Sequence, residues 1–208
     1  VDSENIIKTK LNEAFNYPFL AEESDNSNLN QNQLYWIIDP LDGTYNYYRG
    51  LPHNVVSIAL YEGMTPKLGV IYDFHRDKLI AGTPEIGAFL NGNRFAYRED
   101  ELNQTCETSA LATGLPVNRR SDAASFKQFN HVIGKFKKVR MVGSAATSLS
   151  LVALNTLDCY WEESIMLWDV AAGVAIIEAL GGTCVLRPST KAHSFDVIAP
   201  TNKNLANT

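Results

Sequence analysis

A short apolar run that ends in two acidic residues constrains the fold of this chain more than any other stretch. Residues 34–38 (Leu-Tyr-Trp-Ile-Ile) have the composition of a buried strand. Asp39 and Asp42 follow it with a proline between them, so the backbone must turn there. Gly43 and Thr44 then supply a flexible backbone and a hydroxyl where a helix could begin. Carboxylates bind hard cations, and the N–H groups at a helix start favour phosphate. The stretch therefore contains the parts that metal-assisted phosphoryl chemistry requires.

Two other interpretations explain this acidic stretch less well. An Asx-type turn followed by a helix N-cap accounts for one aspartate and the glycine, but not for a second carboxylate directly after so apolar a strand. The segment 41–44 (Leu-Asp-Gly-Thr) is also similar to the Asp-x-Asp-Gly-Thr motif of haloacid-dehalogenase-type phosphatases. The nucleophilic aspartate of that motif falls on Pro40 here, so an aspartyl-phosphate mechanism is disfavoured.

The composition narrows the class of protein. With 208 residues and 45% hydrophobic content, the chain can bury a substantial core. Its formal net charge of −5, with no basic stretch to offset the acidity, argues against a nucleic-acid polymer as a partner. Three widely spaced cysteines, Cys106, Cys159 and Cys184, do not suggest a disulfide framework and suit a reducing compartment. No window of the sequence resembles a membrane span, so we expect a cytoplasmic protein without a membrane partner.

The pattern of apolar residues divides the chain into two halves. A helical pattern covers residues 4–15. Strand-like segments follow the acidic stretch at 54–61, 67–72, 78–82 and 87–93. One helix followed by consecutive strands indicates an antiparallel α+β arrangement, and a polar stretch at 98–108 then marks a boundary. We therefore expect an α+β half over residues 1–100 and an α/β half over residues 101–208.

The second half alternates between strands and helices. Strand-like segments lie at 109–113, 139–142, 157–161, 183–186 and 195–199. Helical segments lie between them at 122–136, 145–154 and 168–180. Alternation of this kind is typical of α/β proteins.

Three further segments could contribute to the same site. A Glu-Glu pair at 22–23 follows the apolar run 19–21, although paired glutamates are also common as surface charge. Asp169 begins a helix, where it could be a plain N-cap or first-turn acid or could project into the cation site. Residues 143–146 (Gly-Ser-Ala-Ala) lie between a strand and a helix, where the backbone could pack tightly or approach a ligand.

Taken together, these segments resemble the inositol monophosphatase family of Mg²⁺-dependent, lithium-sensitive phosphatases. The first matching motif is 36–47 (Trp-Ile-Ile-Asp-Pro-Leu-Asp-Gly-Thr-Tyr-Asn-Tyr). The second is 168–173 (Trp-Asp-Val-Ala-Ala-Gly), with Glu-Ala-Leu-Gly-Gly at 178–182 downstream. Residues 19–24 (Phe-Leu-Ala-Glu-Glu-Ser) are similar to the family's Gly-Glu-Glu segment, with alanine in place of the usual glycine. The segment 143–146 is similar to a substrate-side turn of the family.

The resemblance implies which residues would hold Mg²⁺. Glu22, Asp39 and the main-chain carbonyl of Leu41 would bind a first ion. Asp39, Asp42 and Asp169 would bind a second, so that Asp39 bridges the two. We expect two or three Mg²⁺ ions in all.

The resemblance also implies which residues take part in the reaction. The catalytic set would be Glu22, Asp42 and Thr44, with the Thr44 hydroxyl orienting the attacking water. The substrate would contact Gly43, Thr44, Ala145, Glu162 and Asp169. In this second set the backbone N–H groups of Gly43 and Thr44 would face the phosphate, and Ala145 and Glu162 would face the hydroxyl-bearing ring.

The implied fold is a layered αβαβα sandwich of the sugar-phosphatase type, which combines α+β and α/β arrangements, and we expect a homodimer. The implied substrate is a small phosphorylated metabolite, a sugar or inositol phosphate, hydrolysed by activated water. Related enzymes hydrolyse fructose 1,6-bisphosphate or adenosine 3′,5′-bisphosphate, so a fructose-1,6-bisphosphatase or a 3′(2′),5′-bisphosphate nucleotidase stays an alternative. A homologue that binds a phosphate ester without turnover is a further alternative.

Overall fold

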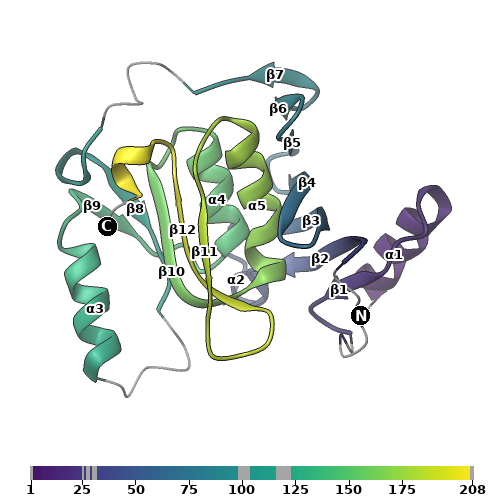
Figure 1. The fold of residues 1–208 in the computed structure, drawn as a ribbon, viewed down its shortest axis with the longest axis horizontal. Coiled ribbons are helices and arrows are strands. Elements are labelled where there is room, and N and C mark those ends of the chain that lie inside the picture. The colour runs from purple at the N-terminus through teal and green to yellow at the C-terminus, as the bar shows by residue number, and fades with distance from the viewer. Residues whose placement is uncertain are drawn as a thin grey trace.

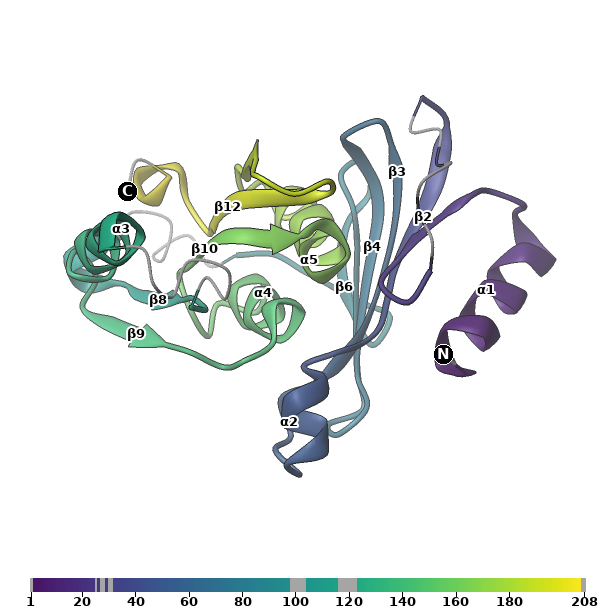
Figure 2. The same cartoon turned by 90° about the horizontal axis from the view of Figure 1, so that it is seen from below.

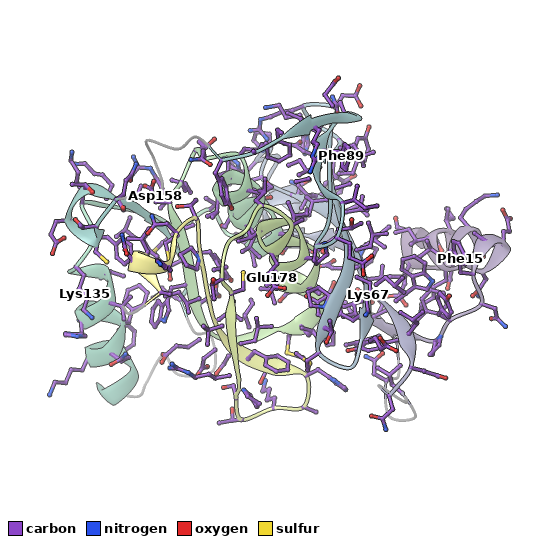
Figure 3. The ribbon with its side chains drawn as sticks, turned by 45° about the horizontal axis from the view of Figure 1, so that its top comes forward. Phe15, Lys67, Phe89, Lys135, Asp158 and Glu178 are labelled. Carbon is purple, nitrogen blue, oxygen red and sulfur yellow. The ribbon has the colours of Figure 1, made fainter. Side chains whose placement is uncertain are left out.

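The elements of the chain are stacked in layers (Figure 1). The computed structural model describes residues 2–24, 26, 29, 32–97, 104–115 and 123–206. Helix α1 (Asp2–Ala14) lies on one face of a seven-stranded sheet, and α4 (Ala145–Ala153) and α5 (Leu167–Ala179) lie on the other (Figure 2). A five-stranded sheet follows, with α3 (Ala123–Ile133) on its outer side. Figure 3 shows Phe15, after α1, and Lys135, after α3, near opposite ends of the molecule. This order confirms the αβαβα sandwich.

The seven-stranded sheet consists of consecutive strands of the first half. Its order is β1 (Phe19–Ala21), β2 (Leu34–Asp42), β3 (Val55–Glu62), β4 (Thr65–Asp73), β5 (Lys78–Thr83), β6 (Gly87–Leu90) and β7 (Asn93–Phe95). Neighbouring strands are antiparallel except β1 and β2, which are parallel. The strands expected after the acidic stretch are confirmed, with Asn91 and Gly92 in the β6–β7 turn at φ of 48° and 79°.

Strand β2 is longer than the sequence predicts. The apolar pattern ends at residue 38, but the strand continues through Pro40 to Asp42. The pairing of β2 with β3 is irregular between Asp39 and Asp42. Because proline has no N–H to donate, it is tolerated in such a bulge, where the ladder does not require one.

The five-stranded sheet is mixed. Its order is β11 (Val185–Pro188), β12 (Ser194–Pro200), β10 (Cys159–Met166), β8 (Ala110–Ala112) and β9 (Lys138–Arg140). The pairs β8–β9 and β8–β10 are parallel, as alternating strands and helices predict. Strand β12, in contrast, is antiparallel to both β10 and β11, so only part of this half follows the expected α/β pattern.

Small residues let α5 lie close to the strands beside it. Residues 170–177 of the helix are all buried, as expected for a helix covered on both sides by sheets. A Cβ placed on Gly69 of β4 would overlap the carbonyl oxygen of Ala172. One placed on Gly82 of β5 would lie 2.8 Å from the Cα of Ile176. The strands therefore approach the helix backbone itself.

Residues of both halves share the core around α5, which belongs to the second half by sequence and packs on the first sheet. The division into an N-terminal half over residues 1–100 and a C-terminal half over residues 101–208 stays a prediction. Residues 98–103 of its expected boundary lie outside the described part of the chain.

Gly173 tests how tightly α5 packs on α4. In an exposed helix, Gly→Ala raises the free energy of unfolding by about 1 kcal/mol. Here a Cβ on Gly173 would overlap the Cβ of Leu149 and lie 2.6 Å from its Cδ1, so Gly173→Ala should lower the free energy of unfolding by about 1–3 kcal/mol. Leu149→Ala removes Cγ and Cδ1 but keeps the Cβ, so it relieves part of the overlap, and the double variant should lose less than the sum of the single losses. Urea denaturation of all three variants measures this, and strictly additive losses would contradict the contact.

Candidate active site

The side chains of Asp39 and Asp42, near the end of β2, point to the same side of the strand. In a regular strand, side chains three residues apart point to opposite faces of the sheet. The bulge between Asp39 and Asp42 removes this alternation, and it turns both carboxylates toward α5. The Asp39 carboxylate also accepts a hydrogen bond of 2.8 Å from the Leu41 N–H through Oδ1, so an Asx-type turn is present as well.

A third carboxylate completes an acidic cluster, which we define as Asp39, Asp42 and Asp169. Asp169 lies in the first turn of α5, whose N-cap is Met166, so it is not the N-cap that its sequence position allowed. Each residue of the cluster offers an oxygen within 4.8 Å of the others. Asp39 is 2% exposed and Asp42 is 8% exposed.

The acidic cluster is a concentration of buried like charge. Burial, followed by the charges of the neighbouring carboxylates, raises the pKa values of Asp39 and Asp169 well above their ordinary range. Within the described residues, no lysine or arginine forms an ion pair with any member of the cluster. The donor atoms are carboxylate oxygens, with no thiolate or imidazole among them. This set fits a hard divalent cation such as Mg²⁺.

Glu22 lies at the edge of the acidic cluster. It follows β1, and its N–H donates to the Ile38 carbonyl at 3.3 Å, which holds it beside the end of β2. Burial raises the pKa of Glu22, and the interaction of its side chain with Asp39 acts in the opposite direction. Glu23 is linked to α1, because its N–H donates to the buried Glu4 carboxylate at 3.0 Å. Glu22 itself is exposed, unlike Asp39 and Asp42.

The short helix α2 (Thr44–Tyr48) begins directly after the bulge. The Thr44 hydroxyl donates to the Leu41 carbonyl at 2.9 Å. Gly43 precedes the helix at φ +87°, and a Cβ there would lie 2.6 Å from the carbonyl oxygen of His53. Only glycine fits this position, both for its conformation and for space.

Asp42 caps a helix, but not the one that follows it in sequence. Its Oδ2 accepts hydrogen bonds from the Ser144 hydroxyl at 2.5 Å and from the Ala146 N–H at 2.6 Å, both at the start of α4. Burial raises the pKa of Asp42 to about 6, and these two hydrogen bonds act in the opposite direction. Gly43, the N-cap residue of α2, makes no side-chain capping bond. The N-cap expected at the helix that follows is therefore wrong, because Asp42 binds the start of the distant helix α4 and α2 has no side-chain cap.

Beside the acidic cluster lies a cavity of about 230 Å³, which we call the ligand cavity. It is lined by Asp42, Thr113, Gly114, Leu115, Gly143, Ser144, Ala145, Ser148, Glu162 and Ile165. Three predicted site residues, Asp42, Ala145 and Glu162, thus share one cavity. The other predicted site residues are absent from its lining: Glu22, Asp39, Leu41, Gly43, Thr44 and Asp169. Asp42 belongs to both groups and joins the acidic cluster to the ligand cavity.

Besides Asp42, the described residues that line the ligand cavity include one further acid, Glu162, whose pKa is raised. Burial raises its pKa to about 7, the charge of Asp42 adds to the effect, and a hydrogen bond from Tyr160 opposes it. That bond runs from the Tyr160 hydroxyl to Oε2 at 2.9 Å. A Cβ on Gly114 would overlap the Glu162 carboxylate, so glycine leaves room for this acid.

Several residues that shape the site could not be recognised from the sequence pattern. Asn46 in α2 is buried and donates through Nδ2 to the carbonyls of His53 and Val142, both at 2.8 Å, which ties α2 to the chain before α4. Ser144 lies in the segment 143–146, and a serine directly before a helical pattern is a recognisable N-cap signal; its hydroxyl accepts the Thr147 N–H at 3.1 Å. Nothing in the sequence pattern marks Ile165 as a cavity residue.

Comparison with known proteins places this geometry in a family. The sequence profile of the inositol monophosphatase family matches residues 1–207. The Nus factor SuhB of Xylella fastidiosa is 40% identical over 184 residues, covering 86% of this chain and 64% of that protein. The inositol-1-monophosphatase of Rhizobium meliloti is 32% identical over 182 residues, covering 86% of this chain and 67% of that protein. A solved inositol monophosphatase from Anabaena (Nostoc) has a TM-score of 0.83 and 33% identity, covering 98% of this chain and 81% of that one.

The chain belongs to the inositol monophosphatase family. The match of the family profile to nearly the whole chain confirms the resemblance drawn from the motifs. The solved Anabaena relative supports the same layered fold. The chain spans about two thirds of the length of the two curated relatives, 64% and 67%.

The pKa of Glu162 predicts a pH dependence of stability. Its folded-state pKa of about 7 lies above the ordinary value of 4.5, so the folded protein keeps a proton that the unfolded chain releases. The resulting stabilisation is fully present below about pH 4.5 and is lost as the pH rises through about 7. Glu162→Gln stays neutral and should therefore narrow the difference in melting temperature between about pH 5 and about pH 8. The exposed Glu62→Gln is the control, and a full wild-type difference in Glu162→Gln would contradict the assignment.

Proposed function

We propose that the chain is a Mg²⁺-dependent phosphomonoesterase that hydrolyses a small sugar or inositol phosphate by attack of an activated water. The observation that supports this most strongly is the convergence of Asp39, Asp42 and Asp169 at the edge of the ligand cavity. The activity named for the Rhizobium meliloti relative is of the same kind.

The proposed cation ligands are Glu22, Asp39, the Leu41 carbonyl, Asp42 and Asp169, for two or three Mg²⁺ ions. Their support is the all-oxygen donor set of the acidic cluster and its buried, uncompensated charge. When bound, the ions would neutralise phosphoryl charge and lower the pKa of a coordinated water. The protein's own residues would bind and orient the phosphate ester and the water.

Residues at the start of α2 would position the phosphate and the water. The backbone N–H groups of Gly43 and Thr44 would donate to phosphoryl oxygens. The Thr44 hydroxyl gives its single proton to the Leu41 carbonyl, so its oxygen is left to accept a hydrogen bond from the attacking water. In this role, with Glu22 and Asp42, it would orient the water for attack.

The walls of the ligand cavity would bind the alcohol part of the ester. Ala145 adds little bulk to the lining, and Glu162 would offer carboxylate oxygens to ring hydroxyls. The Thr113 hydroxyl and the Ser148 hydroxyl are further polar groups of the lining. A polyhydroxylated ring suits such a wall better than an apolar alcohol does.

Other esters and a role without turnover are the alternatives to test. A panel of inositol 1-phosphate, fructose 1,6-bisphosphate and adenosine 3′,5′-bisphosphate separates the related activities. Because one relative carries the name Nus factor SuhB and not that of an enzyme, binding without phosphate release is the second outcome to measure. Within the described residues no helix is long and apolar enough to cross a membrane. The homodimer, the cytoplasmic location and the lack of a nucleic-acid polymer as partner stay predictions.

Asp42→Asn tests the cation assignment. The asparagine oxygen can still cap α4, but the substitution removes one charge from the acidic cluster. We expect phosphate release to fall on the order of 100-fold or more, and the Mg²⁺-induced rise in melting temperature to shrink. Stability without Mg²⁺ should stay equal or rise, because a buried like charge is gone.

Asp73→Asn is the matched control, because Asp73 is also 8% exposed but is paired with Arg76 at 2.7 Å. It should keep the Mg²⁺ response and most of the activity. Wild-type activity that persists in excess chelator, or an Asp42→Asn variant with a full Mg²⁺ response, would remove the cation from the proposed mechanism.

A further inference from the structure

A second bulge, in β10, shapes the ligand cavity from the other side. Strand β10 pairs with β12 on both sides of an interruption between Glu162 and Ile165. At the interruption, Asp196 of β12 lies opposite the two residues 163–164 of β10. One strand therefore carries one residue more than its partner, which defines a bulge.

The bulge puts two side chains on the wall of the ligand cavity. Residues three apart in a regular strand point to opposite faces, yet Glu162 and Ile165 both line the ligand cavity. Tyr160, two residues before Glu162, lies on the same face and donates to it. The bulge thus supplies one polar and one apolar group to the same wall.

Side chains outside the ligand cavity hold this bulge in place. Ser164 has φ +58°, a conformation that costs free energy for any residue other than glycine. Its N–H, which has no regular ladder partner in the bulge, donates to Asp196 Oδ1 at 2.9 Å. Its hydroxyl lies 2.7 Å from the hydroxyl of Ser189. These two contacts oppose the return of β10 to a regular strand.

The connection between β11 and β12, which contains Ser189, also contacts the start of α5. Ser189 and His193 both belong to the connection between β11 and β12. The His193 carbonyl accepts the Leu167 N–H at 2.8 Å. Leu167 is the first residue of α5, two before Asp169. One connection therefore holds both the bulge and the helix that carries an acid of the acidic cluster.

We propose that Ser164 and Asp196 are positioning residues that determine how tightly and how selectively the ligand cavity binds. Their hydrogen bond keeps the bulge, and the bulge points Glu162 and Ile165 at the ligand. A polar Glu162 beside an apolar Ile165 suits a ring with hydroxyl groups at its edge and an apolar face. The inference rests on the proposed function, in which the ligand cavity receives the alcohol part of a phosphate ester.

Asp196→Ala is the first test, with inositol 1-phosphate as the probe. We expect KM to rise about tenfold while kcat changes less than about threefold, because binding is lost and the cation site is kept. Asp196→Asn, whose amide oxygen can still accept the Ser164 N–H, should restore most of the wild-type KM. Amide hydrogen exchange at Ser164 should be faster in Asp196→Ala and close to wild type in Asp196→Asn.

Asp158→Ala is the matched control. Asp158, labelled in Figure 3, precedes β10 and also accepts a strand N–H through its carboxylate, that of Ala110 at 2.6 Å. It does not line the ligand cavity, so its variant should keep the wild-type KM. An equal rise of KM in Asp158→Ala would show a general effect of a weakened sheet and would overturn the inference.

An unchanged KM in Asp196→Ala, with faster exchange at Ser164, would also overturn it. If Asp196→Ala does not fold, Ser189→Ala removes only one hydroxyl contact and should raise KM in the same direction by a smaller factor. An unchanged KM in that variant would contradict the inference too. A wild-type protein that hydrolyses none of the phosphate esters would instead overturn the proposed function, and the inference with it.

Discussion

The burial of α5 between the two sheets is the constraint on which the site depends. Glycines on both partners, Gly69 of β4, Gly82 of β5 and Gly173 of α5, let these strands and α4 approach the helix closely. This packing brings the first turn of α5, with Asp169, against the end of β2, with Asp39. Apolar burial along the rest of the helix stabilises the fold and offsets the cost of gathering carboxylates at its end. A bound cation would remove most of that cost, so the metal-free site stores a destabilisation that ligand binding can relieve.

A β-bulge shapes the site on each of its two sides. A bulge in β2 turns Asp39 and Asp42 to one side, and a bulge in β10 turns Glu162 and Ile165 into the ligand cavity. Asp42 connects the two regions, since it belongs to the acidic cluster, lines the ligand cavity and caps α4 through Ser144. A change at Asp42 is therefore expected to affect charge, shape and the position of α4 together. Changes at the β10 bulge should act mainly on the ligand cavity, because the bond from the Leu167 N–H to the His193 carbonyl holds the start of α5 separately.

The sequence predicted those parts of the site that depend on local structure, such as acidic residues at the ends of strands. Strand-end carboxylates predicted two members of the acidic cluster, Asp39 and Asp42, whereas Asp169 was assigned by the family resemblance, because its place at a helix start left a cap or first-turn acid open. The resemblance to a family then supplied the layered fold, which the structure confirms. The sequence could not reveal contacts set by tertiary packing. The hydrogen bond from Ser144 to Asp42 joins residues 102 positions apart. The positive φ of Ser164 leaves no mark either, because serine has no special preference for that conformation.

In the folded protein, the acidic cluster and Glu22 are expected to form a cation site. It is tested most directly by crystals soaked with Mn²⁺ as a stand-in for Mg²⁺, measured at the manganese absorption edge. We expect anomalous density about 2 Å from carboxylate oxygens of Asp39, Asp42 and Asp169, with a further peak between Asp39 and Glu22. The peaks should weaken when Mg²⁺ is added in excess, because the two ions compete for the same oxygens. A crystal that shows manganese elsewhere on the protein, and none at the acidic cluster, would contradict the account.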